Sequence, residues 1–196
     1  ETNNEISIEH ERIIFEYFKS SIEDFDVVVI SDYNKGLLTY RLVQKIISSA
    51  RKYKKPIVVD PKRDSFEIYK GATIITPNYK ELMKANKDSF LNTTTETRKI
   101  EIFSRDLIKK YRLNSVITTR SFNGLSVITK NKKAITLSSE ALEVFDVSGA
   151  GDTVVAYLSL GISAGLSIEK SAALANKAAG ISVGKFGTAS VYFSEV

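Results

Sequence analysis

Apolar residues in the first part of the chain recur first at helical spacing and then in an unbroken run. Between about residues 8 and 22, Ile13, Ile14, Phe18 and Ile22 fall on related faces of a helix. The segment FDVVVIS follows, and its apolar residues 27–30 show no polar alternation. Such a run is typical of a strand that is buried on both faces of a sheet. The pattern therefore predicts a helix and then a strand of a covered, parallel sheet.

Helical and strand patterns keep alternating up to about residue 120. Thr39 is placed to cap a helix that includes Leu42 and Val43. Strands are predicted in KKPIVVDPK, GATIITPN and NSVITTR, a short helix from near Asn78, and a longer helix over about 96–111. The stretch DSFLNTTTET between these helices is interpreted as a loop. This order predicts an α/β fold with a mostly parallel sheet, helices on both faces and right-handed crossovers.

The pattern changes after Arg120. GLSVITK and KAITLSS predict an antiparallel pair of strands joined across NKK, and two close helices follow over about 151–165 and 167–183. We find no internal repeat and no linker that would divide the chain. A single domain over residues 1–196 is therefore expected.

Composition limits the chemistry that is available to the chain. It has no Cys and a single His, His10, which excludes a disulfide scaffold and disfavours a multi-histidine metal site or a Ser/His/Asp triad. His10 is interpreted as a surface residue of the first helix. No apolar run approaches the roughly 18 residues that span a bilayer, so no membrane association is expected. The absence of Cys is compatible with a cytoplasmic location.

The net charge of +5 raises the question of a nucleic-acid partner. The lysines, however, are scattered in pairs such as Lys54-Lys55 and Lys132-Lys133 at the ends of predicted elements. No run reaches the five to eight basic residues of a polybasic patch. We therefore expect no nucleic-acid partner.

Ligands of an open parallel sheet bind beyond the carboxyl ends of its strands. Polar turns follow the predicted strands at residues 32–36, 60–62, 76–81 and 119–124. The segment FDVSGAGDTVVAYL, residues 145–158, is a fifth candidate for the same rim. The sequence therefore predicts a binding site built from these five segments.

Gly149, Ala150 and Gly151 stand at the mouth of a predicted helix, with Asp152 directly behind them. The first N–H groups of a helix lack intrahelical partners, and glycine lets an anion approach them. Asp152 would repel a phosphate, but it suits a site where a carboxylate accepts the proton of an incoming hydroxyl during phosphoryl transfer. The alternative is a tight turn with an ordinary first-turn acid. The dinucleotide-binding and P-loop motifs do not fit, since the former needs a third glycine at Val154.

Two other polar patterns each allow a structural and a functional interpretation. Asn78 and Glu81 have the spacing of a capping box, which the spacing alone favours over a ligand pair. Asn176 lies within an Ala-rich helix, where a buried amide would need a hydrogen-bond partner. Asp32 and Lys35 fit a solvated turn about as well as a binding rim.

Motifs from about residue 25 onward resemble those of the ribokinase-like (PfkB) carbohydrate kinases. DVSGAGDT resembles the C-terminal signature of that family. SDYNKG, VVDPK, GATIITPNYKE, ITTRSFNG and ANKAAGISVGKFGT resemble, in order and spacing, the bacterial D-glycero-β-D-manno-heptose 7-phosphate kinases within it. The resemblance implies a ribokinase-like three-layer α/β/α sandwich. It also implies phosphoryl transfer from ATP to the anomeric hydroxyl of heptose 7-phosphate, on the route to ADP-heptose for the lipopolysaccharide core.

The resemblance also implies roles for individual residues. It makes Asp152 the catalytic base and residues 149–151 the anion hole. Asn78 and Glu81 match the family's N-x-x-E motif, which helps to hold Mg²⁺ and the nucleotide phosphates. The further matches to nucleotide-binding positions are Tyr79, Lys80, Thr119, Arg120, Gly124, Asn176 and Gly187. The matches near the sugar phosphate are Asp32 and Lys35, and a candidate site for a monovalent cation lies near Asp146 and Ser148.

These motifs begin in the middle of the family's pattern. The resemblance therefore predicts that the first strands of the sheet, most sugar-binding residues and a β-sheet lid lie outside this chain. An uncovered sheet edge would favour a partner, either a second copy in a homodimer or the missing N-terminal part. Two alternative functions are kept: another PfkB-family sugar kinase, and a nucleotide-binding fragment without catalytic activity.

Overall fold

The computed structural model describes residues 4–86, 95–141 and 143–196. The helices are α1 (Ile8–Ser21), α2 (Tyr40–Lys52), α3 (Tyr79–Ala85), α4 (Glu96–Tyr111), α5 (Ala150–Ser163) and α6 (Ile168–Val183). The strands are β1 (Val28–Ser31), β2 (Ile57–Asp60), β3 (Ile74–Ile75), β4 (Ser115–Thr119), β5 (Leu125–Thr129) and β6 (Ile135–Leu137). The predicted order of elements is confirmed. Most of the predicted loop DSFLNTTTET lies outside the described residues.

Four helices begin at a hydroxyl side chain that accepts a hydrogen bond from the first helical turn. These residues are Ser7, Thr39, Thr95 and Ser167. Each satisfies an N–H group that has no partner within its helix. The predicted cap at Thr39 is thereby confirmed. Among the described residues, no helix combines the length and the apolar character needed to cross a membrane.

The six strands form one sheet in the order β1-β2-β3-β4-β5-β6. Neighbours from β1 to β4 run parallel, with Val29 opposite Val58 and Val59 opposite Ile75. Strands β5 and β6 continue the sheet in antiparallel pairing, as predicted from the pattern after Arg120. The carboxyl ends of the four parallel strands therefore share one rim.

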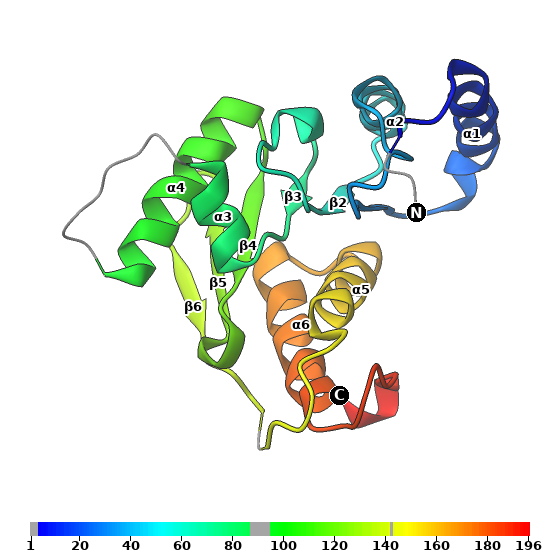
Figure 1. Cartoon of the computed structure of the whole chain (residues 1–196). Coiled ribbons are helices and arrows are strands. Elements are labelled where there is room, and N and C mark those ends of the chain that lie inside the picture. The colour runs from blue at the N-terminus through cyan, green and yellow to red at the C-terminus, as the bar shows by residue number, and fades with distance from the viewer. Residues whose placement is uncertain (1–3, 87–94, 142) are drawn as a thin grey trace.

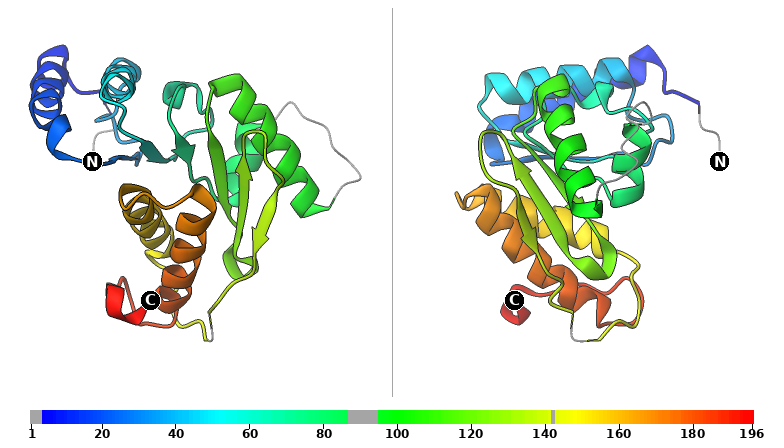
Figure 2. Two further views of the ribbon diagram at one scale, coloured as in Figure 1. Left: turned by 180° about the vertical axis from the view of Figure 1, so that it is seen from behind. Right: turned by 90° about the vertical axis from the view of Figure 1, so that its left-hand side faces the viewer.

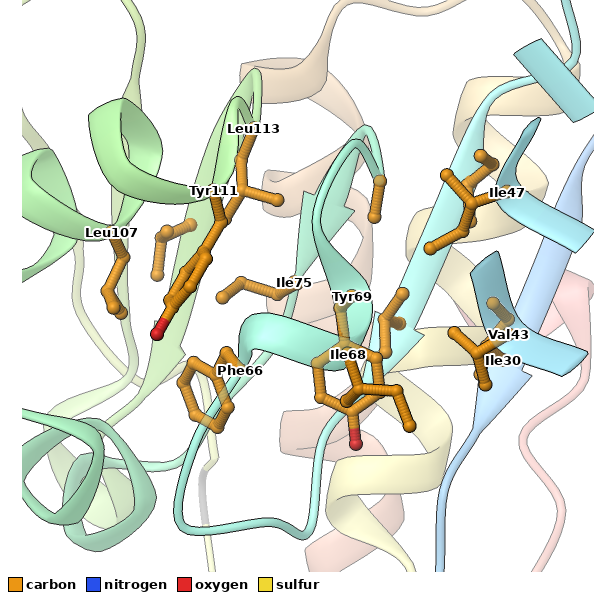
Figure 3. Close-up of a cluster of buried hydrophobic side chains, with 14 of the residues drawn as sticks. Ile30, Val43, Ile47, Phe66, Ile68, Tyr69, Ile75, Leu107, Tyr111 and Leu113 are labelled. Atoms are coloured by element: carbon orange, nitrogen blue, oxygen red, sulfur yellow. The ribbon is translucent and has the colours of Figure 1, made fainter. Parts of the chain in front are cut away.

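Helices cover both faces of the sheet, which gives three layers (Figures 1 and 2). Helices α2, α3 and α4 lie on one face, with α1 beside α2, and helices α5 and α6 lie on the other face. A hydrophobic core lies on each face of the sheet, and alternate residues of a strand point into opposite cores. Val59 belongs to the first core, under α2 and α4, and Val58 belongs to the second core, against α5 and α6. Figure 3 shows part of the first core, in which Phe66 and Tyr69 lie near Ile75.

Strand β1 differs from its sequence prediction. Ile30 is 4% exposed, but Val29 is 45% exposed, so only one face of the strand is well covered. In the part of the chain that the structure describes, β1 is an edge strand that pairs with β2 alone. Helix α5 packs on β2, one strand further into the sheet. The prediction that both faces of β1 are buried is therefore wrong at Val29.

Candidate functional site

Three carboxylates from separate segments come together at the rim of the sheet. Asp60 ends β2, Glu81 lies in the first turn of α3, and Asp152 lies in the first turn of α5. Burial raises the pKa of Asp60, and the charges of Glu81 and Asp152 raise it further, while Lys62 opposes the shift. The two sequence motifs GAGD and N-x-x-E thus contribute to one electrostatic site.

Helix α5 begins with an open backbone surface. Its N-cap, Gly149, has a φ of 80°, a left-handed conformation that glycine adopts without strain, and it provides no side-chain cap. No hydrogen bond given by the described residues uses the N–H groups of Gly151 and Asp152. A Cβ atom added at Gly151 would meet nothing within 4 Å. An anion can therefore reach these two amides without displacing a side chain.

Helix α3 begins with the capping box that the spacing of Asn78 and Glu81 predicted. Asn78 Oδ1 accepts from the Glu81 N–H at 2.9 Å, and Glu81 Oε2 accepts from the Asn78 N–H at 2.8 Å. The other carboxylate oxygen, Oε1, lies 3.2 Å from Lys62 Nζ. The cap therefore fixes the Glu81 carboxylate and leaves one oxygen directed toward Lys62 and Asp60.

The donor set at this rim fits a magnesium ion that binds together with phosphates. Mg²⁺ in phosphoryl-transfer sites is held by one or two carboxylates, with phosphate and water oxygens as further ligands. Asp60 and Glu81 supply such a pair. Within the described residues, no group of three or more His, Cys, Asp or Glu side chains could hold a metal ion alone. Sequence analysis did not single out Asp60 as a candidate ligand, although its position at the end of a buried strand was a usable signal.

Thr119 and Asn78, which are both predicted to bind the nucleotide, lie side by side. They form an isolated parallel bridge, and the Thr119 N–H donates to Pro77 O at 3.1 Å. Arg120, in contrast, donates from Nε to Glu96 Oε1 at 2.9 Å, with its side chain only 9% exposed. At Gly124, a Cβ atom would lie 2.0 Å from Leu137 O. Arg120 and Gly124 thus have structural roles, and their nucleotide contacts stay predictions.

The remaining nucleotide-binding candidates have varied surroundings. Asn176 is 4% exposed and donates from Nδ2 to Ser138 O at 2.7 Å, which supplies the partner that a buried amide needs. Tyr79 is partly buried against the core under α2 and α4, and Lys80 is exposed. Nucleotide contact by these side chains stays a prediction.

The segment around Asp146 contacts the C-terminal loop beside the start of α5. The Ser148 N–H donates to Asp146 Oδ1 at 2.8 Å. Backbone hydrogen bonds from Ser148, and to a lesser extent from Gly187, hold the pKa of Asp146 below its usual value. Thr188 lies next to Gly149, since its Cγ2 atom is 3.6 Å from where a Cβ at Gly149 would be. Gly187 is thereby placed near the predicted anion hole.

Asp32 is buried, and both of its carboxylate oxygens have partners within the chain. Oδ2 accepts from Arg63 Nε and from the Tyr69 hydroxyl, each at 2.6 Å, and Oδ1 accepts from the Asn34 N–H at 2.7 Å. Asp32 therefore anchors the turn after β1, a role that the sequence analysis did not predict. Lys35 is exposed in the same turn. Contact of Asp32 and Lys35 with a sugar phosphate stays a prediction.

A cleft of about 590 Å³ lies beside this network, and not at Asp152. Its lining includes Asn34, Tyr40, Arg63 and Lys84. Acidic and basic side chains both line it, because Glu5 and Asp64 are also present. Asp152 is exposed and is not among the residues that line this cleft.

Replacing Tyr69 by Phe should destabilise the fold without changing its shape. The Tyr69 hydroxyl is buried and donates to a charged carboxylate, and such hydrogen bonds contribute about 1.5–3 kcal/mol. We expect Tyr69→Phe to lower the free energy of unfolding by about that amount in urea titrations. Tyr53→Phe is the matched control, since the described residues give the Tyr53 hydroxyl no hydrogen bond. Equal losses in both variants would contradict the assigned role of Asp32.

Curated relatives match the whole chain. The chain is 38% identical over 191 residues to the bifunctional protein HldE of Syntrophotalea carbinolica, covering 97% of the chain and 38% of that protein. It is 40% identical over 196 residues to HldE of Citrifermentans bemidjiense, covering 100% of the chain and 39% of that protein. The chain thus spans about two fifths of the length of these relatives.

Solved structures share the fold at lower sequence identity. A putative phosphofructokinase from Staphylococcus aureus superposes with a TM-score of 0.74 at 21% identity, covering 94% of this chain and 59% of that one. Ribokinase from Arabidopsis thaliana, solved with ribose and ATP, superposes with a TM-score of 0.69 at 19% identity. The match covers 94% of this chain and 55% of the ribokinase chain. These likenesses confirm the predicted ribokinase-like α/β sandwich. The family model for pfkB family carbohydrate kinases matches residues 2–193. The protein therefore belongs to the pfkB family of carbohydrate kinases.

Proposed function

We propose that this chain is the catalytic and nucleotide-binding part of an ATP-dependent heptose 7-phosphate kinase. The substrate is D-glycero-β-D-manno-heptose 7-phosphate and the product is heptose 1,7-bisphosphate, a precursor of ADP-heptose and the lipopolysaccharide core. One arrangement carries the proposal: the open amides of Gly151 and Asp152, with the Asp152 carboxylate close enough to Asp60 for its charge to raise the pKa of Asp60. The identity of 38–40% to HldE proteins supports the choice of sugar.

The residues at the start of α5 account for the chemistry of transfer. The Asp152 carboxylate accepts the proton of the anomeric hydroxyl as its oxygen bonds to the γ-phosphorus of ATP. The bond from that phosphorus to the bridging oxygen breaks, and ADP leaves. The N–H groups of Gly151 and Asp152 stabilise the negative charge on the transferred phosphoryl group. Asp60 and Glu81 would hold Mg²⁺, which neutralises phosphate charge.

Further parts of the proposal concern ligands, assembly and location. A monovalent cation binds near Asp146 and Ser148, beside the anion hole; a phosphofructokinase-2 of this fold from Escherichia coli was solved in complex with potassium. Residues 1–196 act as one domain, and the exposed edge at Val29 favours a homodimer or association with an N-terminal part. The protein works in the cytoplasm, where ATP is available.

Calorimetric titration separates this function from its alternatives. The chain is titrated with a non-hydrolysable ATP analogue and Mg²⁺, and then with heptose 7-phosphate. Binding of both ligands, followed by turnover with ATP, is the expected result. Nucleotide binding without sugar binding would favour a fragment that needs a partner for catalysis. Turnover with other sugars alone would favour a different PfkB-family kinase, and failure to bind the nucleotide would refute the proposal.

A further inference from the structure

Lys62 lies between the two carboxylates that the proposed function assigns to a divalent cation. Its Nζ atom is 3.5 Å from Asp60 Oδ2 and 3.2 Å from Glu81 Oε1. We propose that Lys62, whose ammonium group is part of the chain, competes with the divalent cation for these two carboxylates. The ammonium group and the metal use the same two carboxylates, so the metal binds only when Lys62 swings aside. This inference rests on the proposed function in one respect, the use of Asp60 and Glu81 as metal ligands.

The two carboxylates are held in place independently of Lys62. The capping bond from the Asn78 N–H fixes Glu81 Oε2, which leaves Oε1 directed toward Lys62. Asp60 is 7% exposed at the end of β2, where the backbone pairs with β1. A cation between these side chains is favourable because Asp60 is buried, Glu81 is partly buried, and their like charges repel each other. The ammonium group of Lys62 supplies this cation. The two carboxylates stay in place when the lysine moves, because the cap and the end of β2 hold them.

Lys62 is held loosely enough to leave. Its contacts of 3.2 and 3.5 Å are longer than the 2.7–2.9 Å that is typical of strong charge-assisted hydrogen bonds. Its side chain is 38% exposed and ends in a compact ammonium on a flexible stem. The neighbouring Arg63 is different, since it donates at 2.6 Å to Asp32 and at 2.5 Å to Leu38 O. Hydrogen bonds therefore hold the Arg63 side chain at the turn after β1, whereas the Lys62 side chain can move.

Release of Lys62 would couple metal binding to nucleotide binding. A nucleotide brings phosphate oxygens to the same rim, and these can accept the displaced ammonium. The cost of displacing Lys62 is then smaller with the nucleotide than without it. The divalent cation should therefore bind weakly to the chain alone and more tightly together with the nucleotide.

The test is direct measurement of Mn²⁺ binding to the full chain without nucleotide, from the electron paramagnetic resonance signal of free Mn²⁺. We expect Lys62→Gln to bind Mn²⁺ about tenfold more tightly than wild type, because the competing charge is gone. Lys62→Arg should bind it more weakly, since a guanidinium pairs with carboxylates in a fixed fork. Lys84→Gln is the matched control, because it removes the same charge from α3, where Lys84 pairs with Asp64. Thermal unfolding of each variant verifies that it is folded.

The outcomes distinguish the competition from the proposed function. If Lys62→Gln binds Mn²⁺ no more tightly than Lys84→Gln, the competition is refuted, and binding of the ATP analogue by wild type would still uphold the kinase. Tighter Mn²⁺ binding by Lys62→Gln that Glu81→Gln abolishes supports the competition. If that result came with no nucleotide binding by wild type, the competition would stand and the kinase proposal would fall.

Discussion

Asp152→Asn is expected to lower the turnover of heptose 7-phosphate by about 10²–10⁴, the usual contribution of a general base. Asparagine has nearly the same shape but does not accept the hydroxyl proton. Affinity for the ATP analogue should stay the same or increase, because a negative charge near the phosphates is removed. Product formation at saturating ATP and Mg²⁺ measures the first effect, and calorimetry measures the second.

The control for this variant is Asp106→Asn, which makes the same exchange at an exposed position of α4. It should leave turnover and nucleotide binding unchanged. Asp152→Asn is also expected to stay folded, since an exposed first-turn acid contributes only about 0.3–1 kcal/mol through the helix dipole. Wild-type turnover in Asp152→Asn would leave Asp152 as an ordinary first-turn acid, the alternative that its position in the sequence also allows.

Local patterns were sufficient to predict most of the fold. The helix expected over about 96–111 is α4, Glu96–Tyr111, because its apolar spacing and the Thr95 cap are both local signals. The antiparallel pair after Arg120 was predicted for the same reason. The exposure of Val29 was not predicted, because an apolar run does not reveal whether a further strand or helix covers it. Exposure at a sheet edge depends on neighbours that are distant in sequence.

Side-chain partners at the site were harder to predict from the sequence than their positions at the rim. Asp32 was placed at the correct rim, but its partners Arg63 and Tyr69 are 31 and 37 residues away. The pairing of Arg120 with Glu96 crosses 24 residues and turns the guanidinium toward α4. Such contacts are set by the packing of whole elements and leave no periodic trace in the sequence. The capping box of Asn78 and Glu81 was predictable because both partners lie within one helical turn.

The cap also shows why one motif can serve stability and function together. Glu81 uses one carboxylate oxygen to begin α3 and directs the other toward Lys62 and Asp60. A sequence pattern that fits a cap therefore does not argue against a ligand. If Glu81 binds the metal as proposed, the cap would hold this ligand rigidly, which is what a phosphoryl-transfer site requires.

Gly151→Ala is expected to separate activity from stability, because its effects on the two have opposite signs. An added Cβ would meet nothing within 4 Å in the chain, so the variant should fold. Alanine also costs less backbone entropy than glycine in a helix, so the free energy of unfolding should rise by up to about 1 kcal/mol. The same methyl group, however, stands where the transferred phosphoryl group would approach the amides of Gly151 and Asp152.

Loss of such hydrogen-bond donors costs about 10²–10³ in turnover, and we expect a decrease of that order for Gly151→Ala. Gly151→Val extends the series, since a larger side chain should lower turnover further while the fold persists. Urea unfolding and product formation, measured on the same preparations, give both quantities. A stabilised Gly151→Ala with wild-type turnover would show that the amides at the start of α5 do not contact the reacting phosphoryl group. A graded loss with side-chain size would instead explain why glycine precedes Asp152: the backbone itself, and not a side chain, is the binding surface.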